Sequence, residues 1–344
     1  MRHPTKPRPG DRVAVLSPSA GLPGLFPLPF DLGLLRLRED FGLVPVEYPT
    51  TRRMGSTPED RAVDIHAAFA DPEIAAVISS IGGDDQIRVL PHLDAALLRA
   101  NPKPFFGYSD NTAFLAYLWA AGVIGFHGGA VMTQFGRPGA LHPVTAAALR
   151  AALFTTGPYD LPEVTASGDI DRPWDDPATF DSEPPLRPCS GWRWHNADQV
   201  VEGRSWGGNV EVLSWLLMAD RAIRPVEDYA GSVLLLETSE EMPTATEVYR
   251  VLRSMGERGL LRQFPAALVG RPKTWYFSKR TTPAEAAAYR DDQRAAVLRA
   301  FAEYSPAATL VFDVDFGHTD PQVVLPYGAP ILVDGPGRRV TVTY

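Results

Sequence analysis

The sequence predicts an α/β protein of about two domains. The first 155 residues alternate short apolar runs with amphipathic stretches, which is the rhythm of βα units in a largely parallel sheet. The chain has 344 residues, more than one ordinary core holds. Hydrophobic residues make up 45% of it and charged residues 22%, the proportions of a folded globular protein. These observations favour two folded units over a disordered chain.

The expected elements of the first part follow one another in βα order. Apolar runs predict strands over 12–21, 43–49, 74–83, 103–109 and 123–129. Amphipathic stretches predict helices over 28–42, 56–72, 85–102, 110–122 and 142–154. The first of these helices closes on a glycine. The second opens with Ser56 and Glu59 at capping-box spacing and with Pro58 in its first turn.

The pattern changes after residue 155. Residues 156–191 are rich in Pro, Asp, Ser and Gly, which indicates an interdomain linker or an ordered loop near the active site. The second domain is expected over 192–344. Its expected elements are a strand over 231–237, a helix over 244–258, a strand over 266–272, a helix over 282–304 and a strand-rich tail from 309.

Charge and cysteine content narrow the function classes. The formal net charge of −8 and the pI near 5.4 argue against nucleic acid or an anionic membrane surface as the main partner. The single cysteine, Cys189, cannot form an internal disulfide. No signal peptide and no membrane-spanning run is apparent. A cytoplasmic enzyme with a small substrate is the expectation.

Ser109 stands in "FFGYSDNTAF", where an apolar strand stops at a glycine and continues as a helix. This is the context of a nucleophile elbow, in which the serine hydroxyl is held up at a strained turn. The position two residues after the serine is Asn111 rather than glycine, so the G-x-S-x-G pattern is not met. A helix cap is the other interpretation of this serine.

Three further stretches carry groups that a serine nucleophile needs. The paired glycines in "SSIGGDDQ" expose backbone N–H groups of the kind that form an oxyanion hole. Glu237 ends the apolar run "VLLLE", where a strand would present its carboxylate in a partly dry place suited to orienting a histidine. Glu240 and Glu241 are interpreted as solvated or capping acids. His318 follows a strand and Gly317 in a rigid loop, which is an accessible place for a general base.

A rival hypothesis treats part of this C-terminal loop as a metal site. Alternation places Asp313 and Asp315 on one strand face, close to His318 and Asp320. No second histidine or cysteine stands at a recognised metal-binding spacing, so neither a metal nor another cofactor is expected.

The four stretches together resemble the LD-carboxypeptidase family of serine peptidases, which includes the microcin C self-immunity hydrolases. That family places its serine in G-Y-S-D, followed by G-G-N, by an apolar strand ending in Glu, and by G-H-x-x-P with a downstream L-P-x-G. The corresponding stretches here are "GYSDNTA" at 107–113, "WGGNVEVL" at 206–213, "LLLETSEE" at 234–241 and "FGHTDPQVVLPYG" at 316–328. Their order and spacing match over nearly the whole chain.

The resemblance implies a catalytic triad and a fold. Ser109 would attack the carbonyl, His318 would act as general base and then acid, and Glu237 would orient His318. The backbone N–H groups of Gly83 and Asp110 would hold the oxyanion. The implied fold is an N-terminal α/β domain of the flavodoxin-like kind, resembling class I glutamine amidotransferases, joined to a C-terminal swivelling β/α domain with the active site between them.

Within the family, "LETSEE" and "GHTDP" are more similar to the microcin C immunity branch than to the cell-wall recycling branch. Immunity proteins cleave an amide that joins a peptide or aminoacyl group to a nucleotide-like moiety, and recycling enzymes release D-alanine from a murein tetrapeptide. In the immunity branch an aromatic residue of the interdomain loop stacks on the purine. Trp174 matches that position best, and Trp192 or Trp194 could serve instead.

The expected function is therefore a cytoplasmic serine hydrolase that cleaves the C-terminal amide of a small peptide or of a peptidyl or aminoacyl nucleotide. A murein tetrapeptide LD-carboxypeptidase is the alternative within the same chemistry. A metal-dependent hydrolase and a non-catalytic protein that binds a peptide–nucleotide toxin are alternatives of other classes. The resemblance also allows a homodimer, although the sequence shows no interface.

Overall fold

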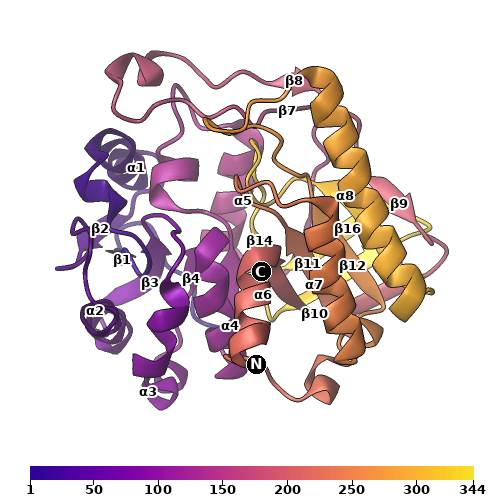
Figure 1. Cartoon of the computed structure of the whole chain (residues 1–344). Helices are drawn as coiled ribbons and strands as arrows, with labels where there is room; N and C mark the ends of the chain where they lie inside the picture. The colour runs from indigo at the N-terminus through magenta and orange to yellow at the C-terminus, as the bar shows by residue number, and fades with distance from the viewer.

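Two β-sheets organise the chain in a computed structural model that describes residues 1–344. The indigo-to-magenta half of the chain surrounds one sheet, and the orange-to-yellow half surrounds the other (Figure 1). Helices and parallel strands alternate in both halves. The expected α/β fold class is confirmed.

The first sheet has six strands in the order β2-β1-β3-β4-β5-β14. They are β1 (Arg12–Leu16), β2 (Val44–Glu47), β3 (Ile74–Ser79), β4 (Phe105–Gly107), β5 (Gly125–His127) and β14 (Leu325–Tyr327). The first five are parallel, and their order is one of the doubly wound orders that place ligand sites at the carboxyl ends of strands. The sixth, β14, comes from the C-terminal part of the chain and pairs antiparallel with β5. No sequence pattern predicted that a strand from the C-terminal part of the chain would join the first sheet.

The helices of the first half are α1 (Pro27–Glu39), α2 (Pro58–Ala70), α3 (Ala95–Ala100), α4 (Thr112–Ala120) and α5 (Pro143–Phe154). The single helix expected over 85–102 is wrong: two short 3-10 turns occupy its first part. Asp94 then caps α3 with its carboxylate, which starts a new helix. The cap of α2 is Thr57 rather than Ser56, since the Thr57 hydroxyl accepts a hydrogen bond from the Asp60 N–H.

The second sheet has eight strands in the order β6-β16-β15-β10-β11-β12-β13-β9. They are β6 (Pro158–Asp160), β9 (Arg193–His195), β10 (Val200–Asn209), β11 (Val233–Glu237), β12 (Ala266–Gly270), β13 (Thr309–Val314), β15 (Pro330–Asp334) and β16 (Arg339–Thr343). Strands β10 to β13 are parallel, so Asn209, Glu237 and the residues after β13 emerge at the same edge. The covering helices are α6 (Val210–Ala219), α7 (Ala245–Glu257) and α8 (Pro283–Tyr304).

The segment 156–191 contains short pieces of regular structure. Strand β6 joins the second sheet through β16, and β7 (Ala166–Ser167) pairs with β8 (Arg187–Pro188). The pink segment between them runs over the top of the molecule toward α1 (Figure 1). The domain boundaries at 155 and 191 remain a prediction, and β14 is the element that crosses them.

One apolar core continues through both halves of the chain. A single cluster of 77 buried residues includes members of both sheets. At the junction the Trp119 ring of the first half stacks on the Tyr229 ring of the second, with centroids 5.0 Å apart. Side chains delivered from the two halves are therefore held by shared packing. None of the helices is both long and apolar enough to cross a membrane.

Gly207 lies in β10 where the strand passes close to its neighbour. Its φ is +131°, and a Cβ there would lie 2.1 Å from the Leu235 carbonyl oxygen of β11. Only glycine fits a position with both constraints.

We expect Gly207→Ala to lower the free energy of unfolding by about 2 kcal/mol more than Gly157→Ala, because overpacking adds to the backbone strain. Gly157 is the matched control, since its φ is also positive, at +100°, while a Cβ there would meet nothing within 4 Å. Urea unfolding followed by circular dichroism measures both variants. Equal losses of stability would contradict the close approach at Gly207.

Candidate active site

Ser109 lies at the carboxyl end of β4, in a turn that leads into α4. Its φ is +62°, a left-handed conformation that is rare for a residue other than glycine. Gly82, after β3, lies against it: a Cβ on Gly82 would be 2.9 Å from the Ser109 Cβ and 3.0 Å from its Oγ. This strained strand-to-helix turn, relieved by a neighbouring glycine, has the features of a nucleophile elbow.

Asp110 and Gly83 are the two residues expected to supply oxyanion N–H groups, and each has contacts of its own. The Asp110 carboxylate accepts hydrogen bonds from the Gln86 N–H, at 2.9 Å, and from the Ser19 hydroxyl. Burial raises the pKa of Asp110 to about 6. Gly83 packs against Ser19 rather than Ser109, since a Cβ on it would lie 2.1 Å from the Ser19 Oγ. The oxyanion role expected for the Gly83 and Asp110 N–H groups remains a prediction.

Glu237 and His318 meet at the edge of the second sheet. Glu237 ends β11, and its Oε2 lies 2.6 Å from the Nδ1 of His318. Burial is the largest single influence and would lower the pKa of His318. The charge and hydrogen bond of Glu237, together with the charges of Glu240 and Glu211, outweigh it, and the pKa rises to about 9. Burial is likewise the largest single influence on Glu237 and opposes its ionisation. The charge and hydrogen bond of His318, with smaller contributions from other neighbours, together outweigh it, so the pKa of Glu237 is lowered. The pair is held as imidazolium and carboxylate.

Two glycines leave room for the Glu237 side chain. A Cβ on Gly317 would lie 2.8 Å from both the Cβ and the Oε2 of Glu237. A Cβ on Gly270, at the end of β12, would lie 2.9 Å from the Glu237 Cβ. The glycine before His318 is therefore required by the carboxylate that contacts the imidazole.

The free ring nitrogen of His318 faces a second carboxylate. Its Nε2 lies 3.5 Å from the Oε2 of Glu240, whose side chain is 41% exposed. The interpretation of Glu240 as a merely solvated acid is wrong, because the turn after β11 folds back toward His318. Only the neighbouring Glu241 is exposed without such a contact.

His127 lies behind Glu237, at the end of β5. Its Nε2 is 3.8 Å from the Glu237 Oε1, and both ring nitrogens are buried without a hydrogen-bond partner. Burial lowers the pKa of His127 to about 4, so the ring is neutral at neutral pH. The sequence analysis did not place His127 in the site. A lone histidine at a strand end gives no signal of what the second sheet places beside it.

Residues of the two halves touch at this place. The ring of Tyr108, next to Ser109, packs edge-on against the His318 ring with centroids 5.0 Å apart. The Asn209 N–H donates a hydrogen bond of 3.1 Å to the Thr112 hydroxyl of α4. The structure thus brings the serine turn beside the Glu237–His318 pair, although the polar contacts of the His318 ring are with Glu237 and Glu240 and not with Ser109.

The two tryptophans expected to bind substrate contact other side chains of the protein. Trp174 is half-buried and packs edge-on against Phe26, with ring centroids 5.9 Å apart. Trp192 is 8% exposed, and its indole N–H donates to the Asp315 carboxylate at 3.1 Å. These placements account for packing roles, and substrate binding by either residue remains a prediction.

The three aspartates of the metal hypothesis each form an ion pair with a different arginine. Asp313 pairs with Arg294 at 3.2 Å and Asp315 with Arg271 at 3.2 Å. Asp320 pairs with Arg137 at 2.9 Å. No group of three or more His, Cys, Asp or Glu side chains is arranged to hold a metal ion. The arrangement favours acid–base chemistry at His318 over a shared ligand set.

Comparison with known families identifies the chain. The LD-carboxypeptidase N-terminal domain matches residues 13–128, and the LD-carboxypeptidase C-terminal domain matches residues 202–333. The chain belongs to the LD-carboxypeptidase family, which confirms the resemblance inferred from the four sequence stretches. It is therefore a serine-type peptidase that hydrolyses a peptide bond.

Three relatives span most of the chain. The microcin C7 self-immunity protein MccF of Escherichia coli is 27% identical over 83% of this chain and 79% of its own length. A putative carboxypeptidase of Treponema pallidum is 30% identical over 84% of this chain and 79% of its own. The murein tetrapeptide carboxypeptidase of Pseudomonas aeruginosa is 29% identical over 83% and 80%.

Solved structures share the fold. An MccF-like protein from Streptococcus pneumoniae, in complex with AMP, superposes with a TM-score of 0.84 at 23% identity, over 97% of this chain and 99% of that one. MccF in complex with aspartyl sulfamoyl adenosine superposes with a TM-score of 0.82 at 23% identity, over 99% of both chains. The two-part architecture is thus that of MccF-like proteins.

We expect the contact between Glu240 and His318 to contribute to the pH dependence of turnover. A base must be unprotonated, so kcat/KM should rise with pH toward the His318 pKa of about 9. Glu240→Gln removes a negative charge that stabilises the imidazolium, so the pKa falls and the rise moves to lower pH, by roughly one unit or less. The pH profile of kcat/KM measures the shift.

The matched control for this profile is Glu241→Gln, which changes the net charge equally at an exposed neighbouring position. Its profile should coincide with that of the unaltered protein. Identical profiles for all three proteins would show that the Glu240 charge does not act on the titrating base.

Proposed function

We propose that this enzyme hydrolyses the amide at the carboxyl side of a small peptidyl or aminoacyl group, with Ser109, His318 and Glu237 as its catalytic triad. The observation that carries the proposal is the buried 2.6 Å hydrogen bond between Glu237 and His318. This pair stands beside the strained turn that holds Ser109. A serine hydroxyl needs such a base, oriented by a third group, to become a nucleophile.

The chemistry assigns one role to each group. His318 Nε2 takes the proton from the Ser109 hydroxyl as Oγ bonds to the carbonyl carbon, and Glu237 stabilises the imidazolium that forms. The carbonyl oxygen becomes an oxyanion, held by backbone N–H groups of the glycine pair and of Asp110. His318 then gives the proton to the leaving nitrogen as the amide bond breaks. Water, deprotonated by the same ring, releases the acyl group from Ser109.

The resting contact between Glu240 and His318 has to be broken for this cycle. Glu240 lies 3.5 Å from Nε2, the nitrogen that would accept the serine proton, and its charge favours the protonated ring. A substrate that displaces the half-exposed Glu240 side chain would lower the pKa of His318 and free Nε2 together. Binding would thereby prepare the base.

For the substrate, we propose an aminoacyl or short peptidyl group linked through an amide to a nucleotide-like moiety. The proposal is supported by the similarity to MccF and by the fold shared with MccF in complex with aspartyl sulfamoyl adenosine. The second candidate is D-alanine release from a murein tetrapeptide, which the relative from Pseudomonas aeruginosa favours. The chain has a single cysteine, which suits the reducing cytoplasm as the place of either activity.

We expect Ser109→Ala to lower kcat by about 10⁴-fold, because the acyl intermediate cannot form. Product formation resolved by mass spectrometry measures the loss. Ser254→Ala is the matched control, because Ser254 is an exposed serine on α7, outside the site. Both variants should keep the far-ultraviolet circular dichroism of the unaltered protein. Undiminished turnover by Ser109→Ala would rule out the serine mechanism.

A side-by-side assay should separate the two substrate candidates. We expect aspartyl sulfamoyl adenosine to give a higher kcat/KM than the murein tetrapeptide L-Ala-γ-D-Glu-meso-diaminopimelate-D-Ala. Each reaction is compared with a Ser109→Ala blank, and the released amine is identified in both. Release of D-alanine with no cleavage of the nucleotide conjugate would instead assign the enzyme to cell-wall peptides.

A further inference from the structure

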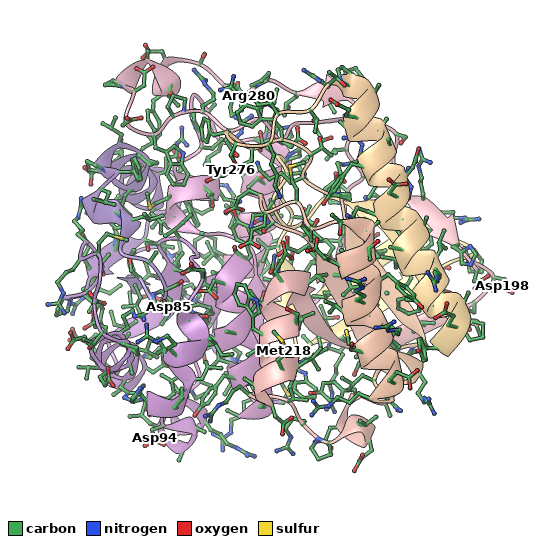
Figure 2. All side chains as sticks on the ribbon, viewed as in Figure 1. Asp85, Asp94, Asp198, Met218, Tyr276 and Arg280 are labelled. Atoms are coloured by element: carbon green, nitrogen blue, oxygen red, sulfur yellow. The ribbon has the colours of Figure 1, made fainter.

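A polar cavity of about 440 Å³ lies outside the proposed triad. The β7–β8 pair, the loop that follows β12 and the N-terminal turns of α8 enclose it. Figure 2 labels Tyr276 and Arg280 on this loop, at the top of the molecule. Ser109, Glu237 and His318 do not line the cavity. Its volume is in the range of small-molecule sites.

The lining is positively charged, in contrast to the chain as a whole. Five arginines and three aspartates face the cavity, whereas the chain has a formal net charge of −8. The five are Arg187, Arg193, Arg271, Arg290 and Arg294. Arginines gathered in a concave place attract anions, and their planar guanidinium groups match the oxygens of phosphates and carboxylates.

The aspartates of the lining already have partners. Asp313 pairs with Arg294 at 3.2 Å, and Asp291 pairs with the same arginine. Asp169 accepts a hydrogen bond of 2.7 Å from the Thr274 N–H and another from its hydroxyl. These carboxylates are thus already engaged in ion pairs or hydrogen bonds within the protein.

Two arginines of the lining form no ion pair with a carboxylate. Arg290 has no carboxylate partner, and its one hydrogen bond is a long one, of 3.4 Å, to the Thr274 hydroxyl. Arg187 makes no ion pair and is exposed on β8. By contrast, Arg271 is paired with the buried Asp315 at 3.2 Å. Arg290 and Arg187 are therefore the groups available to a ligand.

A buried hydroxyl of the lining lacks a partner as well. Thr319 is 6% exposed, and its Oγ1 is buried without any hydrogen bond. An unpartnered buried polar atom costs free energy unless a ligand or water satisfies it. The first turn of α8, a helix of 22 residues, also borders the cavity at Thr282 and Pro283. The positive end of the helix dipole adds to the attraction for an anion.

We propose that this cavity binds the anionic group, a phosphate or a carboxylate, of a small molecule, with Arg290 and Arg187 as its principal contacts. The Thr319 hydroxyl would donate a further hydrogen bond. Trp275, in the same lining, offers a flat apolar surface for the remainder of the ligand.

The cavity is separate from the triad but shares a loop with it. Thr319 directly follows His318, and Asp320 exchanges backbone hydrogen bonds of 2.7 and 2.8 Å with Gly168 of the cavity wall. Lys273 fixes the same wall through the Asp169 carbonyl, at 2.9 Å, and the Asp171 carboxylate, at 2.8 Å. Anion binding in the cavity therefore needs no serine chemistry, and it can be tested independently of the proposed function.

Isothermal titration of the full chain with inorganic phosphate and with succinate tests the proposal at constant ionic strength. We expect at least one probe to bind, and the double variant Arg187→Ala/Arg290→Ala to weaken that binding at least tenfold. The Ser109→Ala variant should bind as the unaltered protein does. Tighter binding of phosphate assigns a phosphate site, and tighter binding of succinate assigns a carboxylate site.

Arg262→Ala is the control for loss of positive charge, since Arg262 is exposed, lies outside the cavity and forms no ion pair. It should leave the affinity unchanged. Thermal unfolding checks that each variant is folded. No heat of binding with either probe up to about 10 mM would overturn the proposal, because an affinity weaker than that is negligible. Equal affinities of the double variant and the Arg262→Ala control would also overturn it.

Discussion

The buried contact between Glu237 and His318 constrains the rest of the site. Removing a carboxylate and an imidazolium from water is costly, and their attraction compensates only when the geometry is good. The 2.6 Å separation therefore fixes the end of β11 relative to the loop after β13. The glycines on either side, Gly270 and Gly317, follow from the same constraint, because any Cβ there would occupy the space of the Glu237 side chain. The spacing of the G-H motif thus has a steric origin.

The surroundings of His318 are acidic, and this determines its resting state. Glu237, Glu240 and Glu211 all favour the imidazolium, while burial opposes it. Glu211 itself is buried next to Glu237, which raises its pKa to about 7. His127 remains neutral and adds no competing positive charge. The resting enzyme holds a proton where the proposed mechanism needs a base, so activation depends on removing negative charge from around the ring.

The sequence predicted the residues that stand at strand ends and missed those that only the tertiary fold brings near. Ser109 follows one apolar run and Glu237 ends another, so local pattern marked both as candidates, and the resemblance to the family implied their roles. No sequence pattern marks Glu240, because its position next to His318 depends on how the turn after β11 folds. The antiparallel pairing of β14 with β5 joins segments about two hundred residues apart, which no local periodicity reports. Arg187 of β8 and Arg290 of α8 likewise line one cavity only because of the tertiary fold.

In the proposed mechanism, the half-exposed side chain of Glu240 would let the enzyme discriminate between substrates. An amide that reaches Ser109 without displacing Glu240 meets a protonated His318, which cannot accept the serine proton. A substrate that fills the space of Glu240 removes one of the charges that stabilise the proton. Binding free energy from parts of the substrate away from the scissile bond would then be used to create the base, which raises kcat rather than affinity. On this argument, truncated substrates should lose turnover more than they lose binding.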